Sequence, residues 1–271
     1  MTKDRETDKG PSARDTGDQA GERPAWQYDE MKASGVDYSD ARLAKDYDAR
    51  HQRFRDYRRQ AETIMCLLAL DSSATLIDMG CGTGAFAIHA AERYRKIYAV
   101  DVSPAMLDLA RVKANEAGMA NIEFHHGGFL TYEHRTEPVD AVVSTVALHH
   151  LPDFWKQVGL YRLARMIRPG GRFYLFDVIF SFGVESYATS VTRFIDTMSE
   201  QMGPTGRREP ETHVRDEYST YQWIMEGMLE RVGFQIDQVN YPNEFLAGYL
   251  CTKRVLSPAD AALTGDTRPR L

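Results

Sequence analysis

Short apolar runs alternate along the chain with segments whose apolar residues recur every three or four positions. The apolar runs predict buried strands over residues 75–79, 96–102, 121–126, 140–145 and 172–178. The segments of helical period predict helices over residues 39–70, 85–94, 103–118, 152–167 and 184–202. Because strands that alternate with helices form a parallel sheet with right-handed crossovers, this order predicts an α/β fold.

The C-terminal part of the chain predicts a reversal of one strand. Residues 203–215 have the composition of a loop, and Ser219-x-x-Gln222 is typical of a capping box that opens a helix ending at Gly233. Strands over 234–241 and 245–252, joined by Pro242-Asn243-Glu244, predict a hairpin. We therefore expect a doubly wound, seven-stranded, mostly parallel sheet with one antiparallel strand from this hairpin and helices on both faces.

The two ends of the chain differ in composition from the rest. Residues 1–25 alternate charged with small polar residues, and 255–271 are similar, so we expect a disordered N-terminal tail and a flexible C-terminal tail. Residues 26–254 are expected to form one domain. It would carry an N-terminal helical cap over about 26–72 and inserted helices over about 180–232.

Composition narrows the classes of function. The formal net charge of −6 argues against a nucleic-acid partner, because phosphate binding needs a basic surface. No apolar run is long enough to cross a membrane, so no membrane partner is expected. The three cysteines lie far apart and form no C-x-x-C pair, which favours a reducing cytoplasm.

A glycine-rich loop carries the main chemical signal. Asp78-Met79-Gly80-Cys81-Gly82-Thr83-Gly84 lies between a predicted strand and a predicted helix, and Asp101 ends the next strand. This arrangement is typical of a nucleoside-binding site in which a carboxylate accepts hydrogen bonds from the ribose hydroxyls. Asp78 would repel a pyrophosphate but attract a cationic amino group.

Four segments in a fixed order resemble the motifs of class I S-adenosylmethionine-dependent methyltransferases. They are 77–84, then 100–103 with Met106, then 140–145 with Ala147-Leu148-His149-His150-Leu151, then 163–175 with Arg168-Pro169-Gly170-Gly171. They cover roughly residues 75–178, and the similarity is strongest to the small-molecule branch, which includes the ubiquinone/menaquinone-type enzymes. One position departs from the family, because Gly128 stands where many members have an acid that contacts the adenine.

The resemblance implies S-adenosylmethionine as cofactor, with S-adenosylhomocysteine as product, and a set of contacts. Asp78 with the backbone of Gly80 and Gly82 would hold the methionine part, and Asp101 the ribose. Val102 and Met106 would cover the adenine, whose recognition would use backbone groups around Gly128 and Phe129. Thr145 would lie near the amino group and Tyr47 would close over the carboxylate, with Arg58 as a further charge partner. The full set predicted to bind the cofactor is Tyr47, Asp78, Gly80, Cys81, Gly82, Asp101, Val102, Met106, Gly128, Phe129 and Thr145.

Candidates for the chemistry follow the fourth and fifth strands. His149 and His150 are candidate bases and Asp177 could bind or deprotonate the acceptor, because ligands bind at the carboxyl edge of such a sheet. The alternatives are a histidine pair that packs in the loop and an aspartate that forms loop hydrogen bonds. His213 is a further candidate for acceptor contact. No metal site is predicted, because no ligand spacing supports one.

We therefore expect in-line methyl transfer to a small-molecule acceptor. A non-catalytic module that binds S-adenosylmethionine or S-adenosylhomocysteine remains an alternative, as do an NAD-type dehydrogenase and a methyltransferase for nucleic acid or protein. Phe176, Phe180, Phe182, Tyr187 and Trp223 would line an apolar acceptor pocket or, alternatively, belong to the core.

Overall fold

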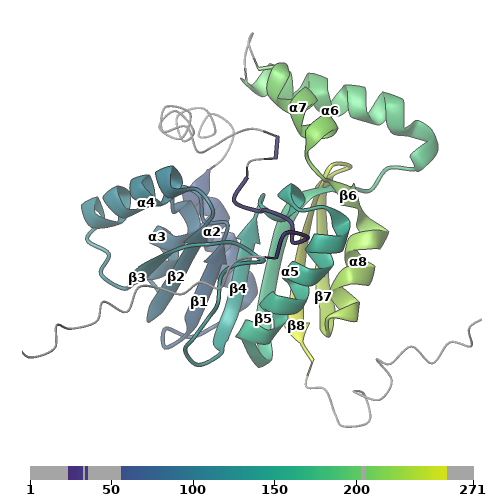
Figure 1. Cartoon of the computed structure of the whole chain (residues 1–271). Coiled ribbons are helices and arrows are strands. Elements are labelled where there is room, and N and C mark those ends of the chain that lie inside the picture. Colours follow the sequence, from purple (N-terminus) through teal and green to yellow (C-terminus); the bar gives the residue numbers. More distant parts are fainter. Residues whose placement is uncertain (1–23, 33, 36–55, 203–205, 255–271) are drawn as a thin grey trace, which may run out of the picture.

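The fold is organised around a single mixed sheet. The computed structural model describes residues 24–32, 34–35, 56–202 and 206–254. The strands follow the order β3-β2-β1-β4-β5-β8-β7, and a short strand, β6, pairs with the end of β5. β8 alone runs antiparallel to its neighbours β5 and β7, so the expected doubly wound, mostly parallel sheet with one reversed strand is confirmed (Figure 1). The strands are β1 (Thr75–Met79), β2 (Lys96–Asp101), β3 (Ile122–His126), β4 (Val139–Thr145), β5 (Ile167–Phe180), β6 (Thr220–Tyr221), β7 (Phe234–Asn243) and β8 (Leu246–Lys253).

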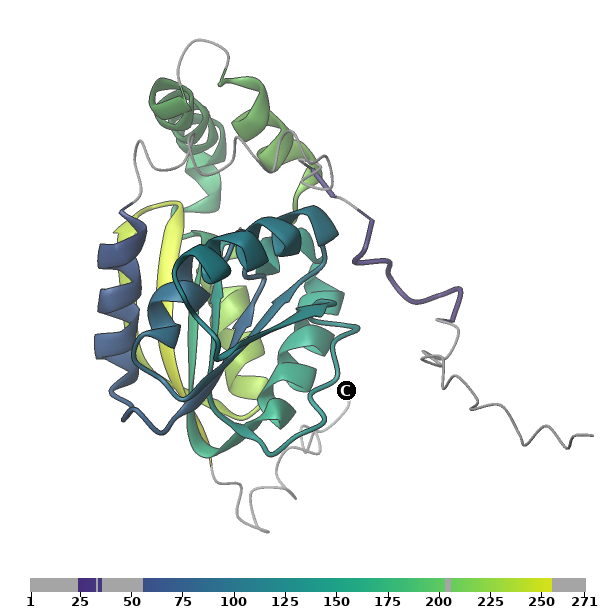
Figure 2. The ribbon, with the colours of Figure 1, turned by 90° about the vertical axis from the view of Figure 1, so that its left-hand side faces the viewer.

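Helices cover both faces of the sheet, and Figure 2 shows them on either side of the strands. Successive residues of β1 and β4 point to opposite faces, and both faces are buried: Leu76 and Ala141 pack with α2, α3 and α4, whereas Ile77 and Val142 pack with α5 and α8. This pattern explains why the strands read as continuous apolar runs. The helices are α2 (Tyr57–Leu68), α3 (Ala85–Ala91), α4 (Pro104–Glu116), α5 (Asp153–Met166), α6 (Tyr187–Met202), α7 (Arg208–Asp216) and α8 (Gln222–Arg231), with short 3-10 turns η1 (Leu148–His150) and η2 (Val184–Ser186).

Local sequence explains where the site-bearing helices begin. Ser103 caps α4 by accepting a hydrogen bond from the backbone N–H of Met106, and Pro104 occupies the first turn, as predicted. α3 begins at Gly84, whose φ of 80° lies in the left-handed region. The ends of β1 and β2 are thereby joined to their helices by tight turns at the carboxyl edge of the sheet.

Two predictions in the segment after β5 were wrong. Residues predicted as a loop form α7, because acidic side chains in its first turn and basic ones in its last turn complement the helix dipole, and Pro210 falls in the tolerated first turn. Ser219 does not cap α8: the helix begins after Tyr221, residues 220–221 form β6, and the Ser219 hydroxyl instead pairs with His213. β6 raises the number of strands among the described residues from the expected seven to eight.

α6 and α7 lie beyond the carboxyl ends of the parallel strands (Figure 1). They pack through a separate apolar cluster around Phe182, Phe194 and Phe245. Residues 24–32 and 34–35 form turns and extended chain near the same edge. Most of the expected tails, and Tyr47 within the predicted 39–70 helix, fall outside the described residues.

Phe234 is the best place to test how the hairpin is attached. Its ring is fully buried at the start of β7 and stacks on Phe173 of β5, with centroids 5.1 Å apart. We expect Phe234→Ala to lower the free energy of unfolding by about 3–5 kcal/mol, because it removes a ring from a packed core. Urea unfolding measures this loss. Trp223→Ala is the control, because the Trp223 side chain is 67% exposed, and it should change stability by less than about 0.5 kcal/mol. If both variants lost the same stability, Phe234 would not be the residue that anchors the hairpin.

Candidate active site

The glycine-rich loop is fixed to the end of β2 by backbone hydrogen bonds. The N–H groups of Gly80 and Cys81 both donate to Val100 O, at 2.8 and 3.0 Å. The N–H of Gly82 donates to Asp101 Oδ2 at 2.7 Å, and the N–H of Ser103 donates to Asp101 Oδ1 at 2.8 Å. These bonds use the N–H groups of Gly80, Cys81 and Gly82 within the protein and leave further lone pairs of Asp101 for a ligand.

Asp78 is a buried carboxylate at the end of β1. Its side chain is 1% exposed, and Oδ2 has no hydrogen-bond partner. Burial raises the pKa of Asp78 to about 7, and the nearby charge of Asp101 adds to this effect. Burying a carboxylate oxygen without a partner costs folding free energy, and a cationic ligand that donates a hydrogen bond to this oxygen would offset that cost.

The loop, Asp78 and Asp101 all face one cavity with a volume of about 260 Å³. This cavity brings together every predicted cofactor residue that the structure describes: Asp78, Gly80, Cys81, Gly82, Asp101, Val102, Met106, Gly128, Phe129 and Thr145. Tyr47 lies outside the described residues. The neighbouring Arg58 does not line the cavity and instead pairs with Glu92 at 3.6 Å.

Glu30, from the N-terminal segment, enters the cavity where β3 ends. Its Oε1 accepts hydrogen bonds from the N–H of Leu130 at 2.9 Å and from Thr131 Oγ1 at 2.7 Å, and burial raises its pKa. A Cβ atom on Gly128 would lie 2.6 Å from Glu30 Oε2 and 2.7 Å from Val102 Cγ1. Position 128 is therefore a glycine because the Glu30 carboxylate occupies the space that a side chain would need.

The backbone after β4 is strained at the edge of the cavity. Val146 has a φ of 54°, which is rare for a β-branched residue, and a hydrogen bond of 2.7 Å from its N–H to Phe176 O holds it there. The turn brings Ala147 against Gly80, where a Cβ atom would collide with it. The strain thus lets the two loops of the site approach each other closely.

The three candidate catalytic residues take different places. His150 is half-buried and lines the cavity, whereas His149 and Asp177 are buried and do not line it. His149 Nδ1 lies 2.5 Å from Asp177 Oδ1, and the His149 N–H donates to Asp177 Oδ2 at 3.1 Å. The histidine pair and Asp177 are therefore contiguous, since the two histidine rings have centroids 4.3 Å apart.

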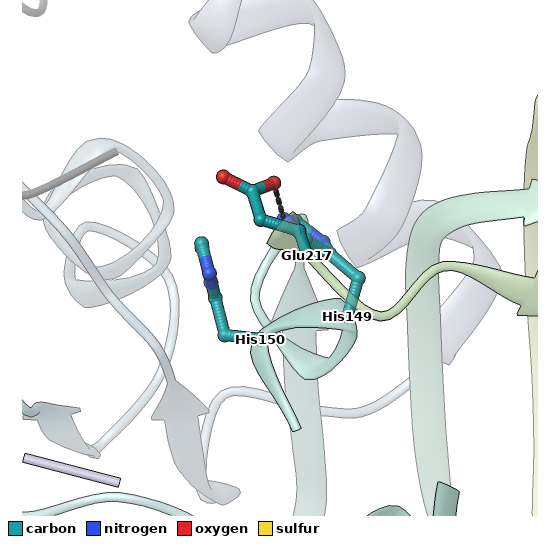
Figure 3. A group of neighbouring side chains, drawn as sticks. All are labelled: His149, His150 and Glu217. Carbon is teal, nitrogen blue, oxygen red and sulfur yellow. Dashed lines mark ion pairs between the residues drawn. The ribbon is translucent and has the colours of Figure 1, made fainter. Parts of the chain in front are cut away.

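Glu217, at the end of α7, extends this cluster. His149 Nε2 lies 3.3 Å from Glu217 Oε2, and His213 Nδ1 contacts the same oxygen. Figure 3 shows both histidine rings and the Glu217 carboxylate together, with the ion pair to His149 drawn as a dashed line. His213, a further candidate, is buried and does not line the cavity.

The ionisable groups of this cluster change one another's pKa values. Burial lowers the pKa of His149, but Asp177 and Glu217 outweigh it and raise that pKa to about 9. Burial lowers the pKa of His150 to about 4, and the neighbouring His149 adds to the effect. Burial would raise the pKa values of Asp177 and Glu217, but the adjacent histidines lower both.

The aromatic residues considered for an acceptor pocket lie elsewhere. None of the five lines the cavity. Phe180 and Phe182 pack in the cluster below α6, and Phe176 packs against the sheet face that carries α2 and α3. Tyr187 and Trp223 are more than 60% exposed. Phe176, Phe180 and Phe182 match the alternative of core residues, whereas Tyr187 and Trp223 belong neither to this cavity nor to the core.

Glu30 and Glu217 were missed from the sequence. Glu30 lies far from every motif, so no local pattern marks it. Glu217 follows His213 by four residues, a spacing that places two side chains on one helix face, but residues 203–215 were predicted as a loop.

Comparison with known proteins agrees with the fold and the motifs. Residues 76–171 match the methyltransferase domain family. An uncharacterized methyltransferase of Anoxybacillus flavithermus is 28% identical over 141 residues, which are 51% of this chain and 64% of that protein. Together with two Geobacillus relatives, the matches span 64%, 61% and 58% of the curated relatives' own length.

Solved structures share the architecture. A SAM-dependent methyltransferase from Aquifex aeolicus superposes with a TM-score of 0.57 and 19% identity, covering 79% of this chain and 98% of that one. The DhpI–SAH complex superposes with a TM-score of 0.56 and 17% identity, covering 80% and 94%.

The fold and the matched segment define a class I methyltransferase domain. Residues 76–171 are similar to the methyltransferase domain family, and the described chain shares the fold of S-adenosylmethionine-dependent methyltransferases. No helix among the described residues is both long and apolar enough to cross a membrane. The expected cytoplasmic location stays a prediction.

Asp177 tests the buried cluster behind the cavity. We expect Asp177→Ala to lower the free energy of unfolding by about 3–5 kcal/mol, because it leaves the buried His149 without its partner. Denaturant unfolding measures this change. Asp237→Ala, which removes a surface carboxylate paired with Arg172 at 2.8 Å, is the control and should cost less than about 1 kcal/mol. A small loss for Asp177→Ala would show that the pair contributes little.

Proposed function

We propose that this protein transfers the methyl group of S-adenosylmethionine to a small-molecule acceptor by direct in-line displacement. The single observation that carries the proposal is the cavity in which Asp78, whose Oδ2 has no hydrogen-bond partner, and Asp101 flank the glycine-rich loop. S-adenosylmethionine supplies a methyl group already activated on a sulfonium. The protein then mainly aligns the acceptor and excludes water.

The residues at the loop suit the amino-acid and ribose parts of the cofactor. Asp78 Oδ2 is free to accept a hydrogen bond from the ammonium group, and Gly80 and Gly82 line the same cavity. Asp101, held by two backbone amides, keeps lone pairs for the ribose hydroxyls. Cys81 and Thr145 complete this end, and Tyr47 stays a predicted cover for the carboxylate.

The adenine end would use Glu30 in place of the acid that many relatives carry after β3. Val102 and Met106 would cover the ring, next to Gly128 and Phe129. Glu30 Oε2 lies beside Gly128, where it can accept from the adenine amino group. Its other oxygen is held by Leu130 and Thr131, which fixes the orientation of the carboxylate.

A small acceptor is favoured by what surrounds the cavity. Residues 30–32 and Ser34 line it from the N-terminal side, and α6 and α7 lie beyond the same sheet edge (Figure 1). The net charge of −6 weighs against a nucleic-acid acceptor, because phosphate binding needs basic residues. We place the acceptor against His150, with His149 and Asp177 as positioning residues behind it.

The acceptor class can be tested with the full chain. Purified protein is incubated with methyl-labelled S-adenosylmethionine and a cell extract that ultrafiltration has split into small and macromolecular fractions. We expect label only in the small-molecule fraction, with an equal amount of S-adenosylhomocysteine, and inversion of a chiral methyl group. Label in the macromolecular fraction would contradict the acceptor class, and binding without turnover would favour a non-catalytic module.

Asp78 gives cofactor binding a pH dependence. Its pKa of about 7 means that a cationic ligand must displace a proton from Asp78 as the pH falls. We expect the affinity for S-adenosylhomocysteine to fall roughly tenfold between pH 7 and pH 5.5, since each pKa unit corresponds to a tenfold change. Calorimetry should record proton release on binding near pH 7. Asp78→Asn should bind more weakly and without this slope; a wild-type slope in that variant would exclude Asp78 as its source.

The proposed hydrogen bond between Glu30 and the adenine amino group can be tested from both sides, by changing Glu30 and by using a ligand without the amino group. We expect Glu30→Ala to weaken binding of S-adenosylhomocysteine by about five- to tenfold, the value of one hydrogen bond. The purine counterpart that lacks the 6-amino group should lose almost nothing. Thr131→Ala removes a hydroxyl that donates to Glu30 and accepts from the Gly128 N–H, so it controls for loss of this local support while the Glu30 carboxylate is kept. If Glu30→Ala weakened both ligands equally, Glu30 would serve only to hold the N-terminal segment.

A further inference from the structure

We propose that His149, His150 and Glu217 bind a divalent transition-metal ion, with Zn²⁺ as the best fit. No metal site was predicted from the sequence, because no ligand spacing supported one. Each of the three residues offers one ligand atom, and these atoms all lie within 4.8 Å of one another (Figure 3). The proposal does not depend on which acceptor the protein methylates.

One pair of the ligand atoms already has the separation found between two ligands of a zinc ion. Ligands about 2.0–2.1 Å from a tetrahedral zinc stand about 3.3 Å apart along each edge of the tetrahedron. His149 Nε2 and Glu217 Oε2 are separated by 3.3 Å. Two imidazoles and one carboxylate are the ligands that zinc and its neighbours prefer, whereas Mg²⁺ and Ca²⁺ prefer oxygen alone.

Both histidines are held in the orientation that metal ligation requires. His149 Nδ1 lies 2.5 Å from Asp177 Oδ1, and His150 Nδ1 lies 3.2 Å from Ser34 O. With each Nδ1 donating to an oxygen, each Nε2 keeps its lone pair for an ion. This is the usual second layer of contacts around a histidine-bound metal.

The third ligand is supported in the same way. His213 contacts the Glu217 carboxylate through Nδ1, while its Nε2 lies 2.8 Å from Ser219 Oγ. The ring of His213 is 4.9 Å from that of His149, measured between centroids. His213 therefore orients Glu217 and is not itself a ligand, because its two ring nitrogens contact Glu217 and Ser219.

Charge balance also favours an ion at this place. Asp177 and Glu217 are both buried and together carry two negative charges when ionised. The nearby buried Lys156 is paired with Asp153 at 2.7 Å. A divalent cation with neutral histidines would neutralise the two buried carboxylates, which are otherwise expensive to bury.

The proposed ion would lie next to the cofactor cavity. His150 belongs to both the cavity lining and the ligand set. A site with three protein ligands keeps a position for another molecule, as zinc sites that handle substrates do. Groups with oxygen or nitrogen donors could therefore reach the ion from the cavity.

Metal binding by the full chain is the direct test. Purified protein is stripped with a chelator and titrated with Zn²⁺ by calorimetry, then with Co²⁺ by visible absorption. We expect about one ion per chain, and a cobalt spectrum of the intense, tetrahedral kind. No binding above that of a surface histidine would overturn the proposal and leave the cluster as a protonated ion-pair network.

Variants then assign the ligands. We expect Glu217→Gln and His150→Gln to weaken Zn²⁺ binding at least tenfold, and Asp177→Asn by about 10- to 100-fold through His149. His134→Gln changes another half-buried histidine with hydrogen bonds of its own, so it is the matched control and should bind as the wild type does. Circular dichroism checks each fold. His150 is half-buried, so its variant keeps the test decisive if Glu217→Gln does not fold. Unchanged Zn²⁺ affinity in folded His150→Gln would exclude this ligand set.

Discussion

The attachment of the glycine-rich loop to the end of β2 is the constraint on which the site depends. Gly80 and Cys81 donate to the same carbonyl oxygen, Val100 O, and Gly82 donates to Asp101. The loop therefore cannot move without releasing Asp101 and opening the end of two strands. Asp78 is carried by β1 into the same corner, so two carboxylates lie close together although like charges repel. Either a proton on Asp78 or a cationic ligand relieves this repulsion without disturbing the sheet.

The sequence was sufficient for features that depend on neighbouring residues. β1 was predicted with its observed bounds, and Ser103 and Pro104 mark the start of α4. The reversal of β8 could be predicted because a short turn between two apolar runs allows only an antiparallel pairing. The motif residues lie at the carboxyl ends of adjacent parallel strands, where the topology itself brings them to one edge.

Features that depend on distant contacts could not be predicted in this way. α7 is strongly polar and contains a proline, so its helical state rests on charges placed to suit the helix dipole and on packing below it. Because these residues were predicted as a loop, Glu217 was not recognised as lying on the same helix face as His213. Glu30 lies about a hundred positions before its hydrogen-bond partners Leu130 and Thr131, and no periodicity relates them. The glycine at position 128 is understood only once Glu30 is seen beside it.

The N-terminal segment touches both halves of this region. Glu30 bonds to the loop after β3, Ser34 O faces His150, and Ser34 Oγ donates to Asp216 O at 2.9 Å. The tether is made of a few hydrogen bonds on a short stretch of chain without regular structure. Peeling it away would expose the adenine end and the histidine cluster in one movement. If ligands exchange by this route, cofactor entry and product release would both require the hydrogen bonds of this segment to break. The rate at which the segment opens would then set an upper limit on turnover.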